Sequence, residues 1–162
     1  MAIPAMDENL RELLSAFNAN HVKYVVVGGY AVFVHAQPRM TKDLDVFVES
    51  SPENARAVYA ALAQFGAPLS DLSVEDFQNP STVVRIGVPP ICVDILQSID
   101  GIDFETVFAG SAEYLVDGDL PTRYISAEHL IINKLASGRL QDLADVEAIQ
   151  HQQRASEGKV KG

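Results

Sequence analysis

Apolar residues recur along this chain with two spacings, one typical of helices and one typical of strands. Leu10, Leu13 and Phe17 lie three or four positions apart, which predicts a helix over about residues 7–19. The continuous apolar run Tyr24–Val27 predicts a buried strand instead. The same patterns predict further helices at about 30–36, 52–65, 103–110, 126–138 and 140–150, and strands that carry Asp43 and Asp45 or cover about 82–86, 91–97, 113–116 and 122–125.

The length of 162 residues predicts one domain with a sizeable core. We expect the core at about 22–125, two C-terminal helices within about 126–151, and a polar, frayed tail at 152–162. No apolar run reaches the length of about 18 residues that a membrane span requires. The N-terminus lacks a signal pattern and the chain has a single cysteine, so we expect a cytoplasmic protein without a membrane partner.

The residues that carry chemistry begin with an Asp-x-Asp pair. Residues two apart on a strand point to the same face, so Asp43 and Asp45 should project together, with Leu44 and Val46 behind them. Two adjacent carboxylates repel each other, and a divalent cation removes that repulsion. Hard oxygen ligands suit Mg²⁺, so this pair predicts a magnesium site.

Gly28 and Gly29 lie between the first strand and a short apolar helix. A Gly-Gly turn at a helix start leaves backbone N–H groups free, and these groups with the helix dipole can bind phosphate. A phosphate site facing a carboxylate metal site points to chemistry on a nucleoside triphosphate.

Asp94 lies in the middle of an apolar strand, where a charged residue is rare unless it is paired or bound to metal. One interpretation makes Asp94 the third carboxylate of a two-metal site. The alternative is a salt bridge to Arg85 across the hairpin formed by the strands at about 82–86 and 91–97.

Lys134 lies on the apolar stripe of its predicted helix and therefore needs an anionic partner. A triphosphate beside the metal site is one candidate. The alternative is that the side chain extends past the core edge to solvent. Asp142 and Asp145 share a helix face, either orienting Lys134 or Arg139 or remaining solvated.

The net charge of −10 argues against broad, nonspecific binding of nucleic acid, which draws affinity from Lys and Arg. A local basic rim at the metal site remains compatible with this charge.

Taken together, the motifs resemble the nucleotidyltransferase superfamily with its polymerase-β-like fold. The resemblance is carried by Gly28-Gly29, Asp43-Leu44-Asp45 and Val93-Asp94-Ile95, in this order. The phrases VVVGGYAVFVHAQPRMTKDLDVFV and INKLASGRLQDLADVEAI resemble the small bacterial branch, with its minimal and AbiEii-type toxin nucleotidyltransferases. This resemblance implies an α+β fold, in which helices pack on a mixed twisted β-sheet and two C-terminal helices follow.

The resemblance also implies a reaction. A nucleoside monophosphate would pass from an NTP to an acceptor hydroxyl of a small molecule, a protein or an RNA 3′ end. Asp43, Asp45 and Asp94 would be the catalytic residues and the ligands of two Mg²⁺ ions, and Asp94 could accept the hydroxyl proton. The expected nucleotide-binding residues are Gly28, Gly29, Arg39, Lys42 and Lys134.

The toxin branch implies a wider role, and a competing hypothesis stands beside the enzyme. The chain could be the toxin or enzyme half of a toxin–antitoxin or phage-defence system, with an antitoxin-like partner protein. The competing hypothesis is a non-catalytic nucleotide-binding or regulatory module with the same fold.

Overall fold

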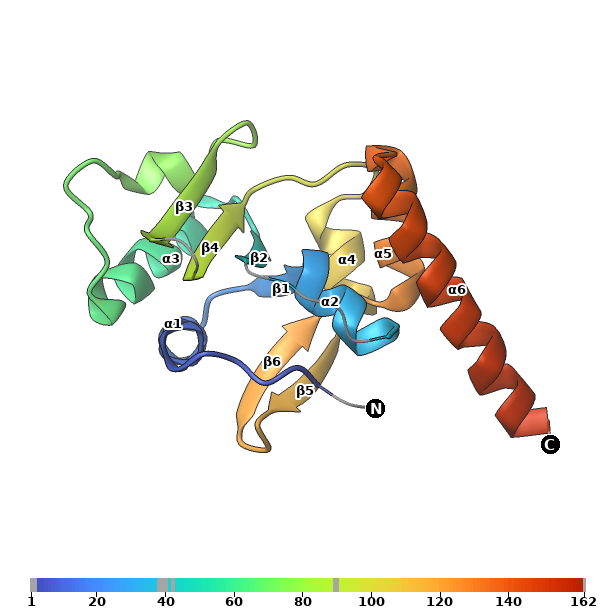
Figure 1. Cartoon of the computed structure of the whole chain (residues 1–162). Coiled ribbons are helices and arrows are strands. Elements are labelled where there is room, and N and C mark those ends of the chain that lie inside the picture. Colours follow the sequence, from blue (N-terminus) through green and yellow to red (C-terminus); the bar gives the residue numbers. More distant parts are fainter. Residues whose placement is uncertain (1–2, 38–40, 42, 89–90, 162) are drawn as a thin grey trace.

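The computed structural model describes residues 3–37, 41, 43–88 and 91–161 (Figure 1). The helices are α1 (Glu8–Ala19), α2 (Gly28–His35), α3 (Pro52–Phe65), the 3₁₀ turn η1 (Val74–Phe77), α4 (Phe104–Gly110), α5 (Ala127–Ser137) and α6 (Leu140–Lys161). The strands are β1 (Tyr24–Val27), β2 (Asp43–Val48), β3 (Val83–Val88), β4 (Ile91–Leu96), β5 (Ala112–Val116) and β6 (Leu120–Tyr124). None of the helices in these residues is long and apolar enough to cross a bilayer.

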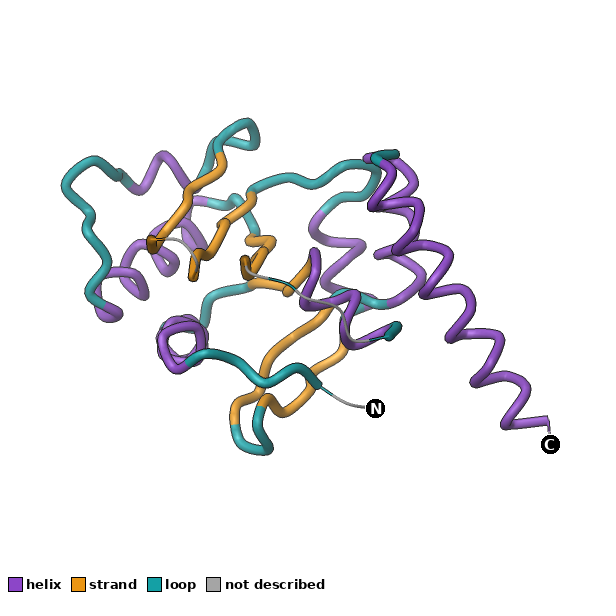
Figure 2. The backbone as a smooth tube through the Cα atoms, in the orientation of Figure 1, coloured by secondary structure: helices purple, strands orange, loops and turns teal. Residues whose placement is uncertain are grey.

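One mixed sheet organises the molecule, with strand order β3-β4-β2-β1-β6-β5. The β2–β4 and β1–β6 pairs are parallel, and the other neighbouring pairs are antiparallel. Helices lie around this sheet, and α5 and α6 follow it as a C-terminal pair (Figure 2). The α+β class and the mixed sheet expected from the sequence are confirmed.

Helix boundaries follow the capping residues in the sequence. The Asp7 side chain accepts from the backbone N–H of Asn9 at the start of α1, and the Ser51 hydroxyl accepts from that of Asn54 at the start of α3. Gly66 ends α3 in the left-handed conformation that glycine adopts without strain. The predicted limits of these helices are confirmed to within about two residues.

Strand β2 separates the core from the candidate site. On one face Leu44, Val46 and Val48 are fully buried. On the other face Asp43 and Asp45 are followed by Phe47, whose ring meets that of Phe104 from α4 at 5.2 Å. The aspartates therefore stand on the same face as an aromatic contact that holds α4 to the sheet.

Two predicted helix boundaries are wrong. Helix α2 begins at Gly28 rather than Tyr30, so both glycines belong to its first turn. Helix α6 does not end near residue 150 but continues to Lys161, and Figure 1 shows it extending away from the sheet. The segment expected as a frayed tail contains Gln, Arg, Ala and Glu, all good helix formers, and its polarity alone was a poor reason to end the helix.

Candidate active site

A cavity of about 570 Å³ lies between the sheet and the C-terminal helices. Its lining residues are Val27, Gly28, Gly29, Thr41, Asp43, Asp45, Asp94, Leu96, Ser98, Ile99, Asp100, Asn133, Lys134, Ser137, Arg139, Gln141 and Asp142. They come from β1, α2, β2, β4, the segment after β4, and the α5–α6 pair. The cavity therefore collects every predicted site residue that the structure describes.

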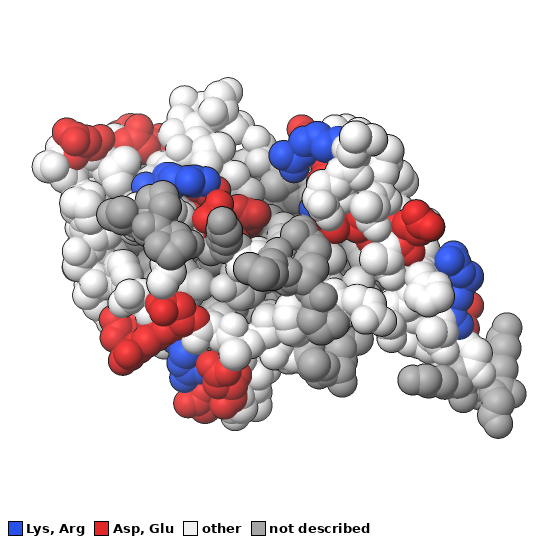
Figure 3. All heavy atoms as spheres, viewed as in Figure 1, with Lys and Arg blue, Asp and Glu red and all other residues white. Residues whose placement is uncertain are grey.

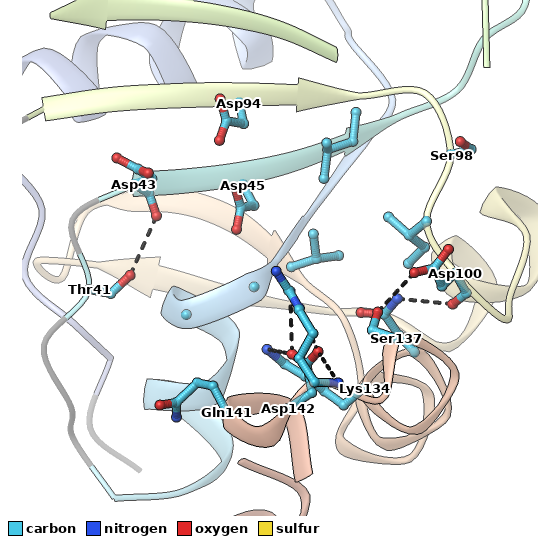
Figure 4. A pocket seen from close by; sticks show the side chains of 17 residues that line it. Thr41, Asp43, Asp45, Asp94, Ser98, Asp100, Lys134, Ser137, Gln141 and Asp142 are labelled. Carbon is cyan, nitrogen blue, oxygen red and sulfur yellow. Dashed lines mark hydrogen bonds and ion pairs between the residues drawn. The ribbon is translucent and has the colours of Figure 1, made fainter. Parts of the chain in front are cut away.

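Three carboxylates line the sheet side of this cavity. Asp43 and Asp45 project from β2, and Asp94 lies on the neighbouring strand β4 (Figure 4). The parallel register places Asp94 directly opposite Asp45. The structure thus brings together the two parts of the predicted metal site, which are about fifty residues apart in the chain.

The pKa of Asp45 is raised in this environment. Burial raises its pKa, and the charges of Asp94 and Asp43 add to the effect, giving a pKa of about 6. Lys134 and Arg85 oppose the shift but do not cancel it. A cation bound between the carboxylates would relieve this repulsion.

Arg85 already neutralises part of the charge. Its Nε donates to Oδ1 of Asp94 at 2.8 Å, and its Nη2 donates to Oδ2 of Asp94 at 3.0 Å. The same Nη2 lies 3.3 Å from Oδ2 of Asp43. The two interpretations of Asp94 are therefore not exclusive, because this residue both faces the other carboxylates and forms the predicted cross-hairpin salt bridge.

The carboxylates fit a divalent cation in their chemistry. They offer only hard oxygen donors, and they face one cavity. Among the described residues, however, no three Asp, Glu, His or Cys side chains are grouped closely enough to hold a metal ion in their present positions. In these positions Asp43 and Asp94 both form hydrogen bonds with Arg85.

The glycine turn lies against Asp45. Gly28 has φ of +66°, and a Cβ at this position would overlap the Asp45 carboxylate. Glycine is therefore required both by the backbone conformation and by the close approach of β2. The N-cap residue Val27 makes no side-chain hydrogen bond to the first turn of α2, and this turn lines the cavity. Binding of phosphate by the backbone N–H groups of this turn stays a prediction.

The structure shows the anionic partners of Lys134, which the sequence alone did not determine. Lys134 is 6% exposed, and its Nζ lies 3.3 Å from Asp142 and 3.0 Å from Asp145. Both aspartates are 2% exposed, and Arg139 binds Asp142 at 2.8 Å. The solvated alternatives for Lys134, Asp142 and Asp145 are wrong, because packing of α6 on α5 buries the cluster. Lys134 also lines the cavity, so its proposed contact with nucleotide stays a prediction.

Two predicted residues lie outside the described part of the chain, and several polar residues of the cavity lining were not predicted. Arg39 and Lys42 lie outside the described residues. Among the unpredicted residues are Asp100 and Ser137, which line the cavity and are joined by a hydrogen bond of 3.0 Å from the Ser137 hydroxyl. Their signal in the sequence was weak, because they are ordinary turn and helix-end residues.

The sequence matches the model of a protein family described as "nucleotidyl transferase of unknown function (DUF2204)" over residues 6–161. The chain therefore belongs to this family of nucleotidyl transferases. No protein of curated function matches the chain.

Solved structures with a similar fold include the three that follow. The lincosamide antibiotic adenylyltransferase LnuA with lincomycin bound has a TM-score of 0.56 at 17% identity, and the match covers 90% of this chain and 97% of LnuA. ANT(2")-Ia in complex with adenylyl-2"-tobramycin has a TM-score of 0.59 at 13% identity, covering 93% and 91% of the two chains. An antigenic nucleotidyltransferase-like protein from Paracoccidioides brasiliensis has a TM-score of 0.53 at 13% identity, covering 90% and 77%. At these identities the likeness establishes the nucleotidyltransferase fold.

Proposed function

We propose that this protein transfers a nucleoside monophosphate from a Mg²⁺-bound NTP to a hydroxyl group of a small molecule. The observation that carries this proposal is the convergence of Asp43, Asp45 and Asp94 on one cavity beside the glycine turn of α2. The family to which the chain belongs supports the reaction class.

The residues that line the cavity would have different roles in this reaction. Asp43 and Asp45 would hold a metal ion on the triphosphate, and Asp94 would share a second ion with them. Bound there, Mg²⁺ would neutralise phosphate charge and acidify the acceptor hydroxyl. Asp94 would accept the hydroxyl proton. The first turn of α2, at Gly28 and Gly29, would bind phosphate oxygens through backbone N–H groups.

The cavity favours a small acceptor that is neutral or cationic. Its volume of about 570 Å³ is that of a small-molecule site. Five aspartates but only Lys134 and Arg139 among basic residues line its described part. Figure 3 shows acidic side chains in several places on one face, with basic side chains next to some of them. The charge of the cavity lining opposes an RNA end, because RNA binding depends on basic side chains. The antibiotic adenylyltransferases LnuA and ANT(2")-Ia point in the same direction.

A toxin–antitoxin role and an antitoxin-like partner receive no support from these comparisons, and they form no part of the proposal.

A second candidate function is a protein with the same fold that binds nucleotide without turning it over. The observation that favours it is that Arg85 forms ion pairs with two of the three carboxylates, those of Asp43 and Asp94. Such a protein would bind nucleotide but release no pyrophosphate.

The test is transfer of label from each α-labelled NTP to a panel of hydroxyl compounds, which includes aminoglycosides, lincosamides and RNA oligonucleotides. We expect Mg²⁺-dependent labelling of a small molecule with release of pyrophosphate. The double variant Asp43→Asn/Asp45→Asn should reduce labelling to background while its circular dichroism spectrum stays unchanged. Persistent labelling by the folded double variant contradicts the metal assignment, and nucleotide binding without pyrophosphate release favours the second candidate.

A further inference from the structure

Arg85 completes a row of charged side chains that crosses three strands. The β3–β4 register places Arg85 opposite Asp94, and the β4–β2 register places Asp94 opposite Asp45. Arg85 also reaches Asp43, so a single guanidinium joins β4 to β2, two strands that come from distant parts of the sequence. One positive charge thus stands among three negative ones on the face that lines the cavity.

The guanidinium of Arg85 lies at a position from which it can move away from the two carboxylates. Its side chain is 52% exposed, whereas that of Asp94 is 16% exposed. It also comes from β3, which is an edge strand of the sheet. Rotation of this side chain toward solvent therefore requires no change in the core.

We propose that Arg85 is a resident counter-cation that positions Asp43 and Asp94 in the free protein and competes with divalent metal for them. The inference rests on the proposed function, because it takes these aspartates as the metal ligands. A metal ion that arrives alone must displace a bidentate, charge-assisted pair. A metal ion that arrives on a triphosphate brings phosphate oxygens, which give the released guanidinium another anionic partner. Arg85 thereby favours binding of a metal–nucleotide complex over binding of the metal ion alone.

The test is a Mg²⁺ titration without nucleotide, followed by thermal unfolding and calorimetry. We expect Arg85→Met to bind Mg²⁺ about tenfold more tightly than the unsubstituted protein, because the competing cation is gone. Bound metal then raises the unfolding midpoint by mass action. Arg85→Gln, which also removes the charge but keeps hydrogen-bond donors, provides the same measurement if Arg85→Met does not fold.

The matched control is Arg56→Met. Arg56 is an exposed arginine of α3 that lies outside the cavity lining, and its replacement changes the net charge equally. Mg²⁺ affinity should stay unchanged in this control. Adding Asp43→Asn/Asp45→Asn to Arg85→Met should abolish the gain.

The outcomes separate the two proposals. Equal Mg²⁺ affinity in Arg85→Met and the unsubstituted protein, with intact binding of Mg²⁺–NTP by both, overturns the role of Arg85 alone. A gain that survives Asp43→Asn/Asp45→Asn also overturns it, because the ion then binds elsewhere. Absence of Mg²⁺ binding in every variant, with and without NTP, overturns the metal site on which the proposed function depends.

Discussion

Two clusters beside the candidate active-site cavity each hold a cation between two aspartates, and they differ in burial. Lys134 bridges Asp142 and Asp145 between α5 and α6, where the side chains are 8%, 2% and 3% exposed. Arg85 bridges Asp43 and Asp94 on the sheet, where they are 52%, 38% and 16% exposed. A buried carboxylate without its counter-charge is costly, whereas a solvated one is not. The first cluster is therefore built to keep its cation, and the second is able to exchange it.

The pKa values of one carboxylate beside each cation differ in direction. Burial alone would raise the pKa of Asp142, but hydrogen bonds from Arg139 and Lys134 outweigh burial and lower it. Burial and the charges of Asp94 and Asp43 raise the pKa of Asp45 to about 6. The helix cluster thus satisfies its negative charge, and the sheet cluster retains an excess that a metal ion can use.

The largest expected effect comes from removing the buried cation. Lys134→Met should lower the free energy of unfolding by about 3 kcal/mol, because two buried aspartates lose their shared counter-charge. Urea denaturation monitored by circular dichroism measures this loss. The matched control is Lys23→Met, since Lys23 is 57% exposed and its ion pair with Glu49 is 3.6 Å long. A loss no larger than that of the control shows that the helix cluster is not a structural clamp.

The next effect concerns Asp45 and depends on pH. Its pKa of about 6 in the folded protein exceeds the ordinary value of 3.8, so the folded state binds more protons between these values. Stability from this group is therefore present at low pH and is lost as the pH rises through about 6. Asp45→Asn removes the charge and should stabilise the fold at pH 7.5 by about 1–3 kcal/mol.

Denaturation at pH 7.5 and pH 5 measures this difference, which should shrink at the lower pH as Asp45 becomes protonated. Glu53→Gln, an exposed substitution on α3, provides the control and should show no such dependence. An Asp45→Asn variant that is less stable than the unsubstituted protein at pH 7.5 argues against excess negative charge at the sheet cluster.

The same two clusters show what the sequence could predict. Asp43 and Asp45 were placed correctly, because strand alternation is local, and Asp94 was found because a charge inside an apolar strand is conspicuous. The Arg85–Asp94 pair could also be predicted, because the two residues lie on the strands of one hairpin. The contact between Arg85 and Asp43 could not be predicted, because it depends on the parallel register of β2 and β4, which no local pattern encodes. Lys134 was recognised as needing an anion, but whether α6 or a ligand supplies it depends on tertiary packing.

The smallest expected effect is on the stability of Arg85→Met without metal. Although Arg85 contacts two aspartates, its own side chain is 52% exposed and that of Asp43 is 38% exposed, so water screens much of the interaction. The midpoint of thermal unfolding should therefore move by no more than about 3 °C. Arg11→Met is the comparison, because Arg11 also bridges two aspartates, Asp117 and Asp119, at 2.7 and 2.8 Å, while it ties α1 to the β5–β6 turn. If Arg85→Met loses much more stability than Arg11→Met, the sheet cluster is a clamp like the one around Lys134. Its arginine would then be too firmly held to give way to a metal ion, and the contrast between the two clusters would fail.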